Sequence, residues 1–444
     1  MSLTRNQIII IGVIGFVVLF FILVFLGIIP GLKKPGSGGS FGSIGGGKQT
    51  VLNFWGIIDN DEDKRAIQSI IEEYQKVNKG VQINFQAFSN KITYEKTLLN
   101  ALATGQAPDI LMFHSGWLSK HRDKVSPLSE TAFSLSRFQQ LFPQVAEQDF
   151  VIKQQEKPSV IYAVPLYIDT LALIYNKDIF DAKAIALPPT NWQSFQNLIP
   201  YLTEKNLVNQ ITKAGAAIGG SEKNVNAASD LLNLLMLQFG SKMIDDYGKI
   251  QFGQKGLEAL NFYLQFANPN SPYYTWNENL RYSLDSFSDG STAIVFNYAS
   301  SLPLIKAKNP YLKIGISPMP QLPTADQPID YANYWGLSVS NQSRYPDLAW
   351  NFILFATTNP QIAENFIQTA KKPPALRTLI SKYINDPELG VFNRQSLTAR
   401  SWRQPDEEAV KKIFSDMIES ILSGRLSPQK ALEQAGNEIN EINQ

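Results

Sequence analysis

The stretch Tyr162–Phe180, YAVPLYIDTLALIYNKDIF, decides the fold of this chain. It predicts a strand that is broken at Pro165, a second apolar strand over Leu171–Tyr175, and then a polar turn. A series of alternating strands and helices lies on each side of it. We therefore expect the backbone to leave one lobe of the protein here and to enter a second lobe, with Tyr167 and Asp169 at the crossing.

The region before this crossing predicts an open α/β sheet. Between the first two predicted strands, apolar residues recur at helical spacing and predict a helix. A second predicted helix, which ends at Gly105, precedes the third strand. The β-α-β-α-β order predicts a parallel sheet, because crossover connections are right-handed. The loops after the three strands would emerge at their carboxyl ends, where such sheets bind ligands. The predicted strands are Val51–Trp55, Val81–Phe88 and Asp109–Phe113.

Length and composition limit the classes of protein that fit. A chain of 444 residues is long enough for two domains and an appendage. Its 40 Lys and Arg nearly balance its 39 Asp and Glu, so we expect no nucleic-acid partner. The absence of cysteine excludes disulfides, thiolate metal sites and lipid attachment through cysteine. Because the only histidines are His114 and His121, we also predict no metal site and no cofactor.

The N-terminal region predicts an attachment to a membrane. After a short tail (1–7), residues 8–29 are apolar and uncharged, and about 20 such residues span a bilayer core. The run is longer than the apolar core of a cleaved signal peptide and no Ala-x-Ala-like site follows, so we interpret it as a retained transmembrane signal anchor. Residues 30–49 are rich in Gly and Ser and predict a flexible linker. We expect the remaining body to lie outside the cytoplasm.

Five separated motifs occur in a characteristic order. One is the crossing stretch itself, with its Tyr-Asn-Lys-Asp turn; the others are LLNALATGQAPDILMF (98–113), FSDGSTAIVFN (287–297), SRYPDLAWNFILF (343–355) and LSGRLSPQKALEQAGNEIN (422–440). Together they resemble the extracellular solute-binding proteins of ABC importers, specifically the maltose-binding-like sugar receptors. Members of that family are usually secreted or anchored through a lipidated cysteine, whereas this chain has a long apolar N-terminal segment instead.

The resemblance implies a periplasmic-binding-protein-like α/β fold. Two lobes, each with a central mixed β-sheet flanked by helices, would enclose a cleft, after an N-terminal transmembrane helix. The expected N-terminal lobe comprises residues 50–165 and 298–338, and the expected C-terminal lobe comprises 166–297 and 339–444. Two further crossings would lie at 287–298 and 334–340.

The resemblance also implies a function and a set of contact residues. The protein would bind a mono- or oligosaccharide by hinge closure and pass it to ABC permease subunits, without catalysis. Sugar sites combine aromatic faces with carboxylates and amides. The positions implicated are Trp55, Asp59, Ser89, Asn90, His114, Trp117, Asp169, Asn297, Tyr298, Tyr334, Trp335, Gly336, Arg377 and Trp402.

Several of these residues also have a purely structural interpretation. Asp59 is at least as suited to capping a helix, Trp55 to packing in a core, and Gly336 would serve a site by allowing close approach of a ligand. Alternative functions stay open too. Asp59 and Asp169 could be the two carboxylates of a carbohydrate-active enzyme, the solute could be a polyamine or another organic molecule, and the body could be a sensor that has lost transport.

Overall fold

The computed structural model describes residues 49–154, 157–245 and 248–442. The predicted tail (1–7), the signal anchor (8–29) and all of the linker except Gln49 lie outside the described residues. Within the described ranges, no helix has both the length and the apolar character needed to cross a bilayer.

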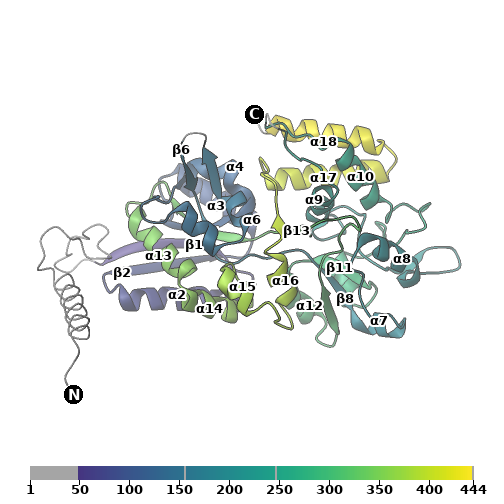
Figure 1. Cartoon of the computed structure of the whole chain (residues 1–444), viewed down its shortest axis with the longest axis horizontal. Helices are drawn as coiled ribbons and strands as arrows, with labels where there is room; N and C mark the ends of the chain where they lie inside the picture. Colours follow the sequence, from purple (N-terminus) through teal and green to yellow (C-terminus); the bar gives the residue numbers. More distant parts are fainter. Residues whose placement is uncertain (1–48, 155–156, 246–247, 443–444) are drawn as a thin grey trace, which may run out of the picture. The chain divides into compact units, whose positions relative to one another are not determined.

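Two hydrophobic cores divide the body, and we call the parts around them the first and second lobes (Figure 1). The sheet of the first lobe has the order β2-β1-β3-β14-β4, and β7 also pairs with β14. Strands β1, β2 and β3 are parallel, as the sequence predicts, whereas β14 is antiparallel to β3. The sheet is therefore mixed. Its strands are β1 (Thr50–Ile57), β2 (Val81–Phe88), β3 (Ile110–His114), β4 (Val125–Ser126), β7 (Val164–Pro165) and β14 (Trp335–Ser340).

Amphipathic helices cover this sheet. Helix α2 (Asp61–Val77) begins where Asn60 Oδ1 accepts a hydrogen bond from Asp63 N, so Asn60, and not Asp59, is its N-cap. Its buried side chains recur at helical spacing and end at Tyr74, whose ring meets that of Phe352 edge to face at 5.1 Å. The other helices of this lobe are α3 (Lys91–Ala103), α4 (Leu118–His121), α5 (Leu135–Leu141), α6 (Gln144–Phe150), α13 (Pro346–Thr358), α14 (Pro360–Ala370) and α15 (Arg377–Lys382).

The second lobe is built on a three-stranded antiparallel sheet. Strand β8 (Ala172–Asn176) lies between β11 (Ile294–Asn297) and β12 (Ile314–Ser317). All of β11 and most of β8 are buried, which fits their nearly continuous apolar sequence. The helices around this sheet are α7 (Lys177–Ala182), α8 (Trp192–Leu202), α9 (Ala228–Gln238), α10 (Gly253–Leu264), α11 (Ser283–Ser288), α12 (Leu302–Lys308), α16 (Gly390–Gln395), α17 (Glu407–Leu422) and α18 (Pro428–Ile442).

Short elements complete the fold. The antiparallel pairs β5 (Val151–Gln154) with β6 (Lys157–Ile161), and β9 (Glu204–Lys205) with β10 (Ile211–Lys213), form separate two-stranded sheets. Strand β13 (Asp330–Tyr331) pairs in parallel with β15 (Ala399–Arg400). The 3-10 turns are η1 (Ser115–Trp117), η2 (Arg122–Lys124) and η3 (Ala299–Ser301).

The two cores divide the chain differently from the predicted lobe boundaries. Residues 298–331, expected in the N-terminal lobe, stay with the second core, because β12 pairs with β8 and α12 packs beside it. Residues 339–382, expected in the C-terminal lobe, belong to the first core, because β14 enters the first sheet and α13 and α14 cover it. Strand β11 is thus not a crossing, and the chain returns to the first lobe after Tyr331.

Gly336 gives a test of how β14 packs. A Cβ at this position would lie 2.8 Å from both the Phe150 ring and Val164 O, so an added methyl group meets backbone that cannot move aside easily. We expect Gly336→Ala to lower the free energy of unfolding by about 1–3 kcal/mol, measured by urea denaturation. Gly80→Ala, where no atom lies within 4 Å of the added Cβ, is the matched control and should change stability far less. Equal effects of the two substitutions would contradict this packing.

Candidate functional site

A cavity of about 290 Å³ opens between the two lobes. Ile57, Ser89 and His114 contribute to it from the carboxyl ends of β1, β2 and β3, the edge at which parallel sheets bind ligands. The opposite wall comes from the second lobe. The lining residues are Ile57, Asp59, Ser89, Lys91, His114, Tyr167, Asp169, Asn226, Ala227, Ser229, Asp230, Tyr298, Ser300, Asn333, Trp335, Gln404, Glu407, Glu408 and Lys411.

Part of the predicted contact set lines this cavity. Trp335 is buried, its ring centre 4.7 Å from that of His114. Asp59 is exposed and pairs with Lys372, whose Nζ is 2.5 Å from Asp59 Oδ2. The predicted residues in the lining are Asp59, Ser89, His114, Asp169, Tyr298 and Trp335. Their contact with a solute stays a prediction.

Other predicted residues from the first lobe do not line the cavity, and local packing accounts for them. Asn90 Oδ1 caps α3 by accepting from Thr93 N. Tyr334 donates its hydroxyl to Asp149 Oδ2 in the core, at 2.8 Å. The close approach at Gly336 is to Phe150 and Val164, not to a cavity. Trp55 and Trp117 belong to an aromatic cluster with Phe88 and Tyr94.

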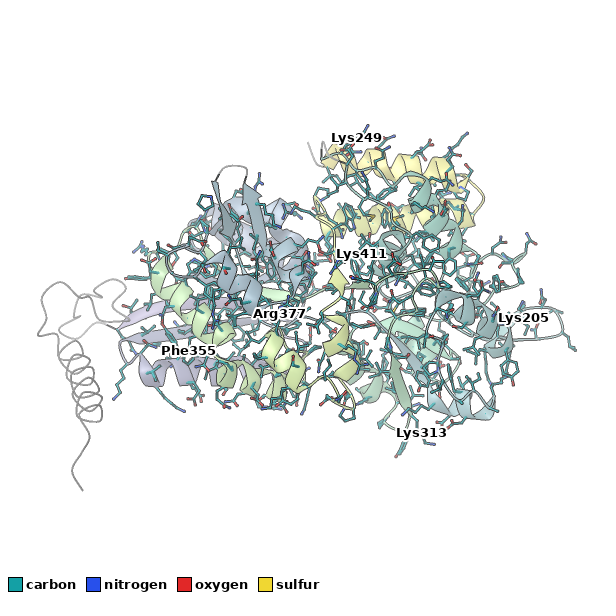
Figure 2. The ribbon with its side chains drawn as sticks, in the orientation of Figure 1. Lys205, Lys249, Lys313, Phe355, Arg377 and Lys411 are labelled. Atoms are coloured by element: carbon teal, nitrogen blue, oxygen red, sulfur yellow. The ribbon has the colours of Figure 1, made fainter. Side chains whose placement is uncertain are left out.

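The remaining predicted residues also lie outside the lining. Asn297 is buried and donates from Nδ2 to Asn226 Oδ1 at 2.7 Å, so it orients a residue that does line the cavity. Trp402 is buried and its Nε1 donates to Asn233 Oδ1. Arg377, labelled in Figure 2, donates from Nε to Phe142 O at 2.9 Å. These contacts hold segments of the fold together.

Asp169 agrees with its predicted place at the crossing. Its side chain is buried, and its oxygens accept backbone hydrogen bonds from Thr170, Ala299 and Ser300 at 2.9–3.0 Å. Burial raises the pKa of Asp169 to about 6, although these N–H groups oppose the rise. Asp169 therefore ties the crossing segment to η3 in the second lobe, at the cavity wall.

Several lining residues escaped the sequence analysis. Glu407 and Glu408 begin α17, where acidic side chains are expected simply because they stabilise a helix N-terminus. Asn333 directly precedes the predicted contact Tyr334 in the sequence but was not itself predicted. Asp230, in the first turn of α9, has the same ordinary explanation as the α17 acids. The missed polar residues are Lys91, Asn226, Ser229, Asp230, Ser300, Asn333, Gln404, Glu407, Glu408 and Lys411.

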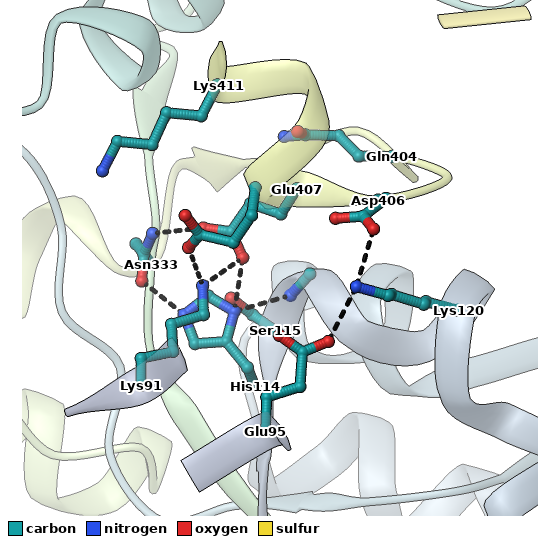
Figure 3. Close-up of polar contacts among 12 residues, drawn as sticks. Lys91, Glu95, His114, Ser115, Lys120, Asn333, Gln404, Asp406, Glu407 and Lys411 are labelled. Carbon is teal, nitrogen blue, oxygen red and sulfur yellow. Dashed lines mark hydrogen bonds and ion pairs between the residues drawn. The ribbon is translucent and has the colours of Figure 1, made fainter. Parts of the chain in front are cut away.

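A network of polar contacts joins the lobes at the cavity (Figure 3). Glu407 Oε2 lies 2.8 Å from His114 Nδ1 and 2.7 Å from Lys91 Nζ. Asn333 Nδ2 donates to Glu407 Oε1 at 3.2 Å. Burial opposes ionisation of Glu407, but the charges of His114 and Lys91 hold its pKa well below the usual value. We call Lys91, His114, Asn333 and Glu407 the interlobe network.

A second set of contacts crosses between the lobes beside this network. Lys120 Nζ lies 2.8 Å from Glu95 Oε1 in the first lobe and 2.6 Å from Asp406 Oδ2, the N-cap of α17 (Figure 3). Hydrogen bonds from His121 and Lys120 outweigh burial and lower the pKa of Glu95 to about 2. Helix α17 packs on the second core through Val410 and Phe414. The acidic residues at its start therefore form ion pairs that join the second lobe to the first.

Carboxylates line part of the wall that the second lobe contributes. Asp230 Oδ2 accepts the Tyr298 hydroxyl at 2.7 Å, and burial together with Glu407 raises the pKa of Asp230 to about 6. Lys411 supplies a positive charge beside them, 3.6 Å from Glu222. Within the described ranges, no group of three or more His, Asp and Glu side chains is arranged to hold a metal ion.

Two lobes joined by crossing segments, with a polar cavity between them, are the architecture typical of solute-binding receptors. The sequence profile of the family described as bacterial extracellular solute-binding protein matches residues 59–363. The match covers more than half of the chain, and the protein belongs to that family. The resemblance inferred from the five motifs is confirmed.

Individual relatives are distant but extensive. A maltotriose-binding protein of Pyrococcus abyssi is 24% identical over 330 residues, covering 73% of this chain and 66% of that protein, which is just under two thirds. A solute-binding protein of Thermotoga lettingae bound to α-D-tagatose superposes with a TM-score of 0.69 at 21% identity, over 89% and 100% of the two chains. A cyclic maltosyl-maltose-binding protein of Arthrobacter globiformis gives 0.73 at 17% identity, over 89% and 99%. These structures confirm the fold.

A substitution at Gly116 tests whether the first lobe contacts Glu407 when solute is bound. A Cβ there would lie 2.6 Å from Glu407 Oε2 and 3.2 Å from Glu407 Cβ, so a methyl group would displace the carboxylate of the interlobe network. We expect Gly116→Ala to weaken binding of the solute by about tenfold, the cost of losing one charge-assisted hydrogen bond, while thermal stability changes little. Gly80→Ala is the control. Unchanged affinity in Gly116→Ala would mean that Glu407 and Gly116 do not come together in the ligand complex.

Proposed function

We propose that this protein binds a mono- or oligosaccharide in the interlobe cavity and delivers it to the permease of an ABC importer. The observation that carries the proposal is the position of Trp335, an aromatic ring that lines a cavity whose other lining is rich in carboxylates and amides. A sugar presents an apolar ring face, which an aromatic ring can cover, and a rim of hydroxyls, which carboxylates and amides can bind.

The polar groups are divided between the lobes. Asp59 and Ser89 belong to the first lobe, and Asn226, Asp230 and Glu408 belong to elements that pack on the second. Carboxylates accept hydrogen bonds, whereas amides both donate and accept, so together they can satisfy hydroxyls of either role. A solute that contacts both walls favours the closed arrangement, since only there are all of its contacts made.

The location proposed from the sequence fits this role. Membership of an extracellular family supports a position outside the cytoplasm. Residues 8–29 would act as the membrane anchor and residues 30–49 as its flexible linker, which would keep the receptor near the permease. Related proteins named for maltotriose and for cyclic maltosyl-maltose support a carbohydrate as the solute.

A glycosidase role has little support from the two carboxylates considered for it. Asp59 is paired with Lys372, and both oxygens of Asp169 accept backbone hydrogen bonds. A general acid or nucleophile must instead face the scissile bond. The names of the related proteins also describe binding, not hydrolysis.

A cationic organic solute is the second candidate. Five carboxylates line the cavity, and Lys91 and Lys411 are its only lysines. Such an excess of acidic groups favours a polyamine or an amino-substituted ligand over an anionic one. The carboxylates are Asp59, Asp169, Asp230, Glu407 and Glu408.

Calorimetry of the whole soluble body against a panel of mono- and oligosaccharides and polyamines tests the proposal. We expect one class of sugar to bind, and Trp335→Ala to weaken that binding at least tenfold, because it removes the stacking face. Tyr311→Ala, a 90% exposed aromatic residue that does not line the cavity, is the control and should bind normally. Heat from a polyamine but from no sugar would contradict the sugar assignment, and cleavage of a glycoside would contradict the receptor function.

A further inference from the structure

Lys372 is a buried lysine of the first lobe that lies against residues of the cavity wall. It follows the C-terminus of α14, and the next two residues run along the crossing segment. Ile168 N donates to Pro373 O at 3.3 Å, and Tyr167 forms an isolated antiparallel bridge with Pro374. Lys372 is 5% exposed and does not itself line the cavity.

The ammonium group of Lys372 contacts two carboxylates and an aromatic ring. Nζ lies 2.5 Å from Asp59 Oδ2 and 3.4 Å from Asp63 Oδ2. It also lies 5.4 Å from the centre of the Tyr167 ring, which is within the range of a cation–π contact. Burial lowers the pKa of Lys372, but the charges of Asp59 and Asp63 outweigh burial and hold this pKa above its ordinary value. Lys372 is therefore positively charged at neutral pH.

The two carboxylate oxygens of Asp59 have different surroundings. Oδ2 accepts a hydrogen bond from Lys372, whereas within the described ranges no hydrogen bond or ion pair engages Oδ1. The backbone N–H of Asp59 donates to Asp63 Oδ2 at 2.9 Å, which fixes the residue further. Because the Asp59 side chain is 45% exposed and lines the cavity, its Oδ1 is available to accept a hydrogen bond from a solute hydroxyl.

The charge of Lys372 alters the electrostatic balance of the cavity. Five carboxylates and two lysines line it, and this comparison leaves out the ammonium group that pairs with Asp59. Lys91 Nζ pairs with Glu407 at 2.7 Å and with Glu408 at 3.1 Å. Three of the five carboxylates thus already have a lysine partner. At Asp59, a cationic solute would meet an ion pair and would gain little Coulombic energy, whereas a hydroxyl needs only the free acceptor oxygen.

We infer that Lys372 is a specificity-determining residue of the cavity: it holds Asp59 as an acceptor for a hydroxyl of a neutral solute and offsets the charge that would attract a cationic one. The inference rests on the proposed function, because it concerns selection among solutes of the same cavity. Lys372 acts through Asp59, since it does not line the cavity itself. Specificity is a difference between two affinities, and Lys372 changes both in the direction that favours a sugar over a polyamine.

Calorimetry on the intact protein, with maltotriose and spermidine as the two probes, tests this inference. We expect the wild type to bind maltotriose and not spermidine. Lys372→Met removes the charge, so Asp59 loses its fixed position and becomes an unpaired carboxylate. Maltotriose should then bind about tenfold more weakly, and spermidine at least about tenfold more tightly than to the wild type.

A matched control removes a lysine from elsewhere in the first lobe. Lys382 of α15 pairs with Glu364 at 2.5 Å and does not line the cavity. Lys382→Met changes the net charge of the protein by the same amount as Lys372→Met. It should leave the affinity for both probes unchanged, because neither Asp59 nor its surroundings are altered.

Two double variants separate selectivity from an effect on folding. Lys372→Met leaves Asp63 buried without its cation, which destabilises the fold. Combining it with Asp63→Asn removes that buried charge, and this double variant should show the same change of preference. Adding Asp59→Asn to Lys372→Met should abolish the gain in spermidine binding, because Asp59 carries that gain. Equal weakening of both probes would mean that Lys372 has only a structural role, and would overturn the inference.

The outcomes also separate this inference from the proposed function. No gain in spermidine binding in either variant that lacks Lys372 would overturn the inference, whether or not a sugar binds. A gain that persists after Asp59→Asn would overturn it as well. If another sugar of the panel binds in place of maltotriose, that sugar serves as the neutral probe. Failure of the wild type to bind any sugar would contradict the proposed function, while the spermidine comparison would still test Lys372.

Discussion

Strand β14 enters the first sheet antiparallel to β3, with Trp335 opposite His114 in the register. This pairing joins the two lobes, because the chain leaves the second core at Tyr331 and enters the first sheet directly afterwards as β14. It places His114, Asn333 and Trp335 at one edge of the cavity. The pairing leaves no room for a side chain at Gly336, where an added Cβ would lie 2.8 Å from both the Phe150 ring and Val164 O. Packing in the core of the first lobe thus determines the position of the candidate site.

Ion pairs then determine how the second lobe contacts this edge of the cavity. Helix α17 begins with the N-cap Asp406 followed by Glu407 and Glu408, and Lys91, His114 and Lys120 face these residues from the first lobe. Acidic residues are favourable at a helix N-terminus in any case, and here they also act between lobes. The Glu407 side chain is 13% exposed, so its contacts are weakly screened by solvent. These ion pairs therefore help to hold the two lobes together in the arrangement described.

The parts of the fold that depend on local sequence patterns could be predicted from the sequence. The β-α-β-α-β series that ends at Phe113 has a strong periodic pattern, and its strands pair in parallel as predicted. The apolar pattern of Tyr162–Phe180 predicted a change of lobe, and the chain does pass from the first core to the second there. The lobe boundaries after residue 298 were not predictable in the same way, because strand partners such as β12 with β8 depend on contacts between residues far apart in sequence. The α17 acids were missed because a helix cap explains them equally well. Trp402 and Tyr334 were expected as contacts because the family resemblance implied them, yet Asn233 and Asp149 satisfy their polar atoms in the interior.

The distance between the lobes in solution tests the central claim most directly. Because the chain contains no cysteine, Val77→Cys and Tyr311→Cys would introduce unique labelling positions, which are 70% and 90% exposed. They lie in the first and second lobes, respectively. Pulsed electron spin resonance between spin labels at these positions, with and without a bound sugar, should show the distance distribution narrow and shift towards one closed arrangement. A sugar that binds with measurable heat while the distribution stays unchanged would contradict solute binding by closure of the lobes.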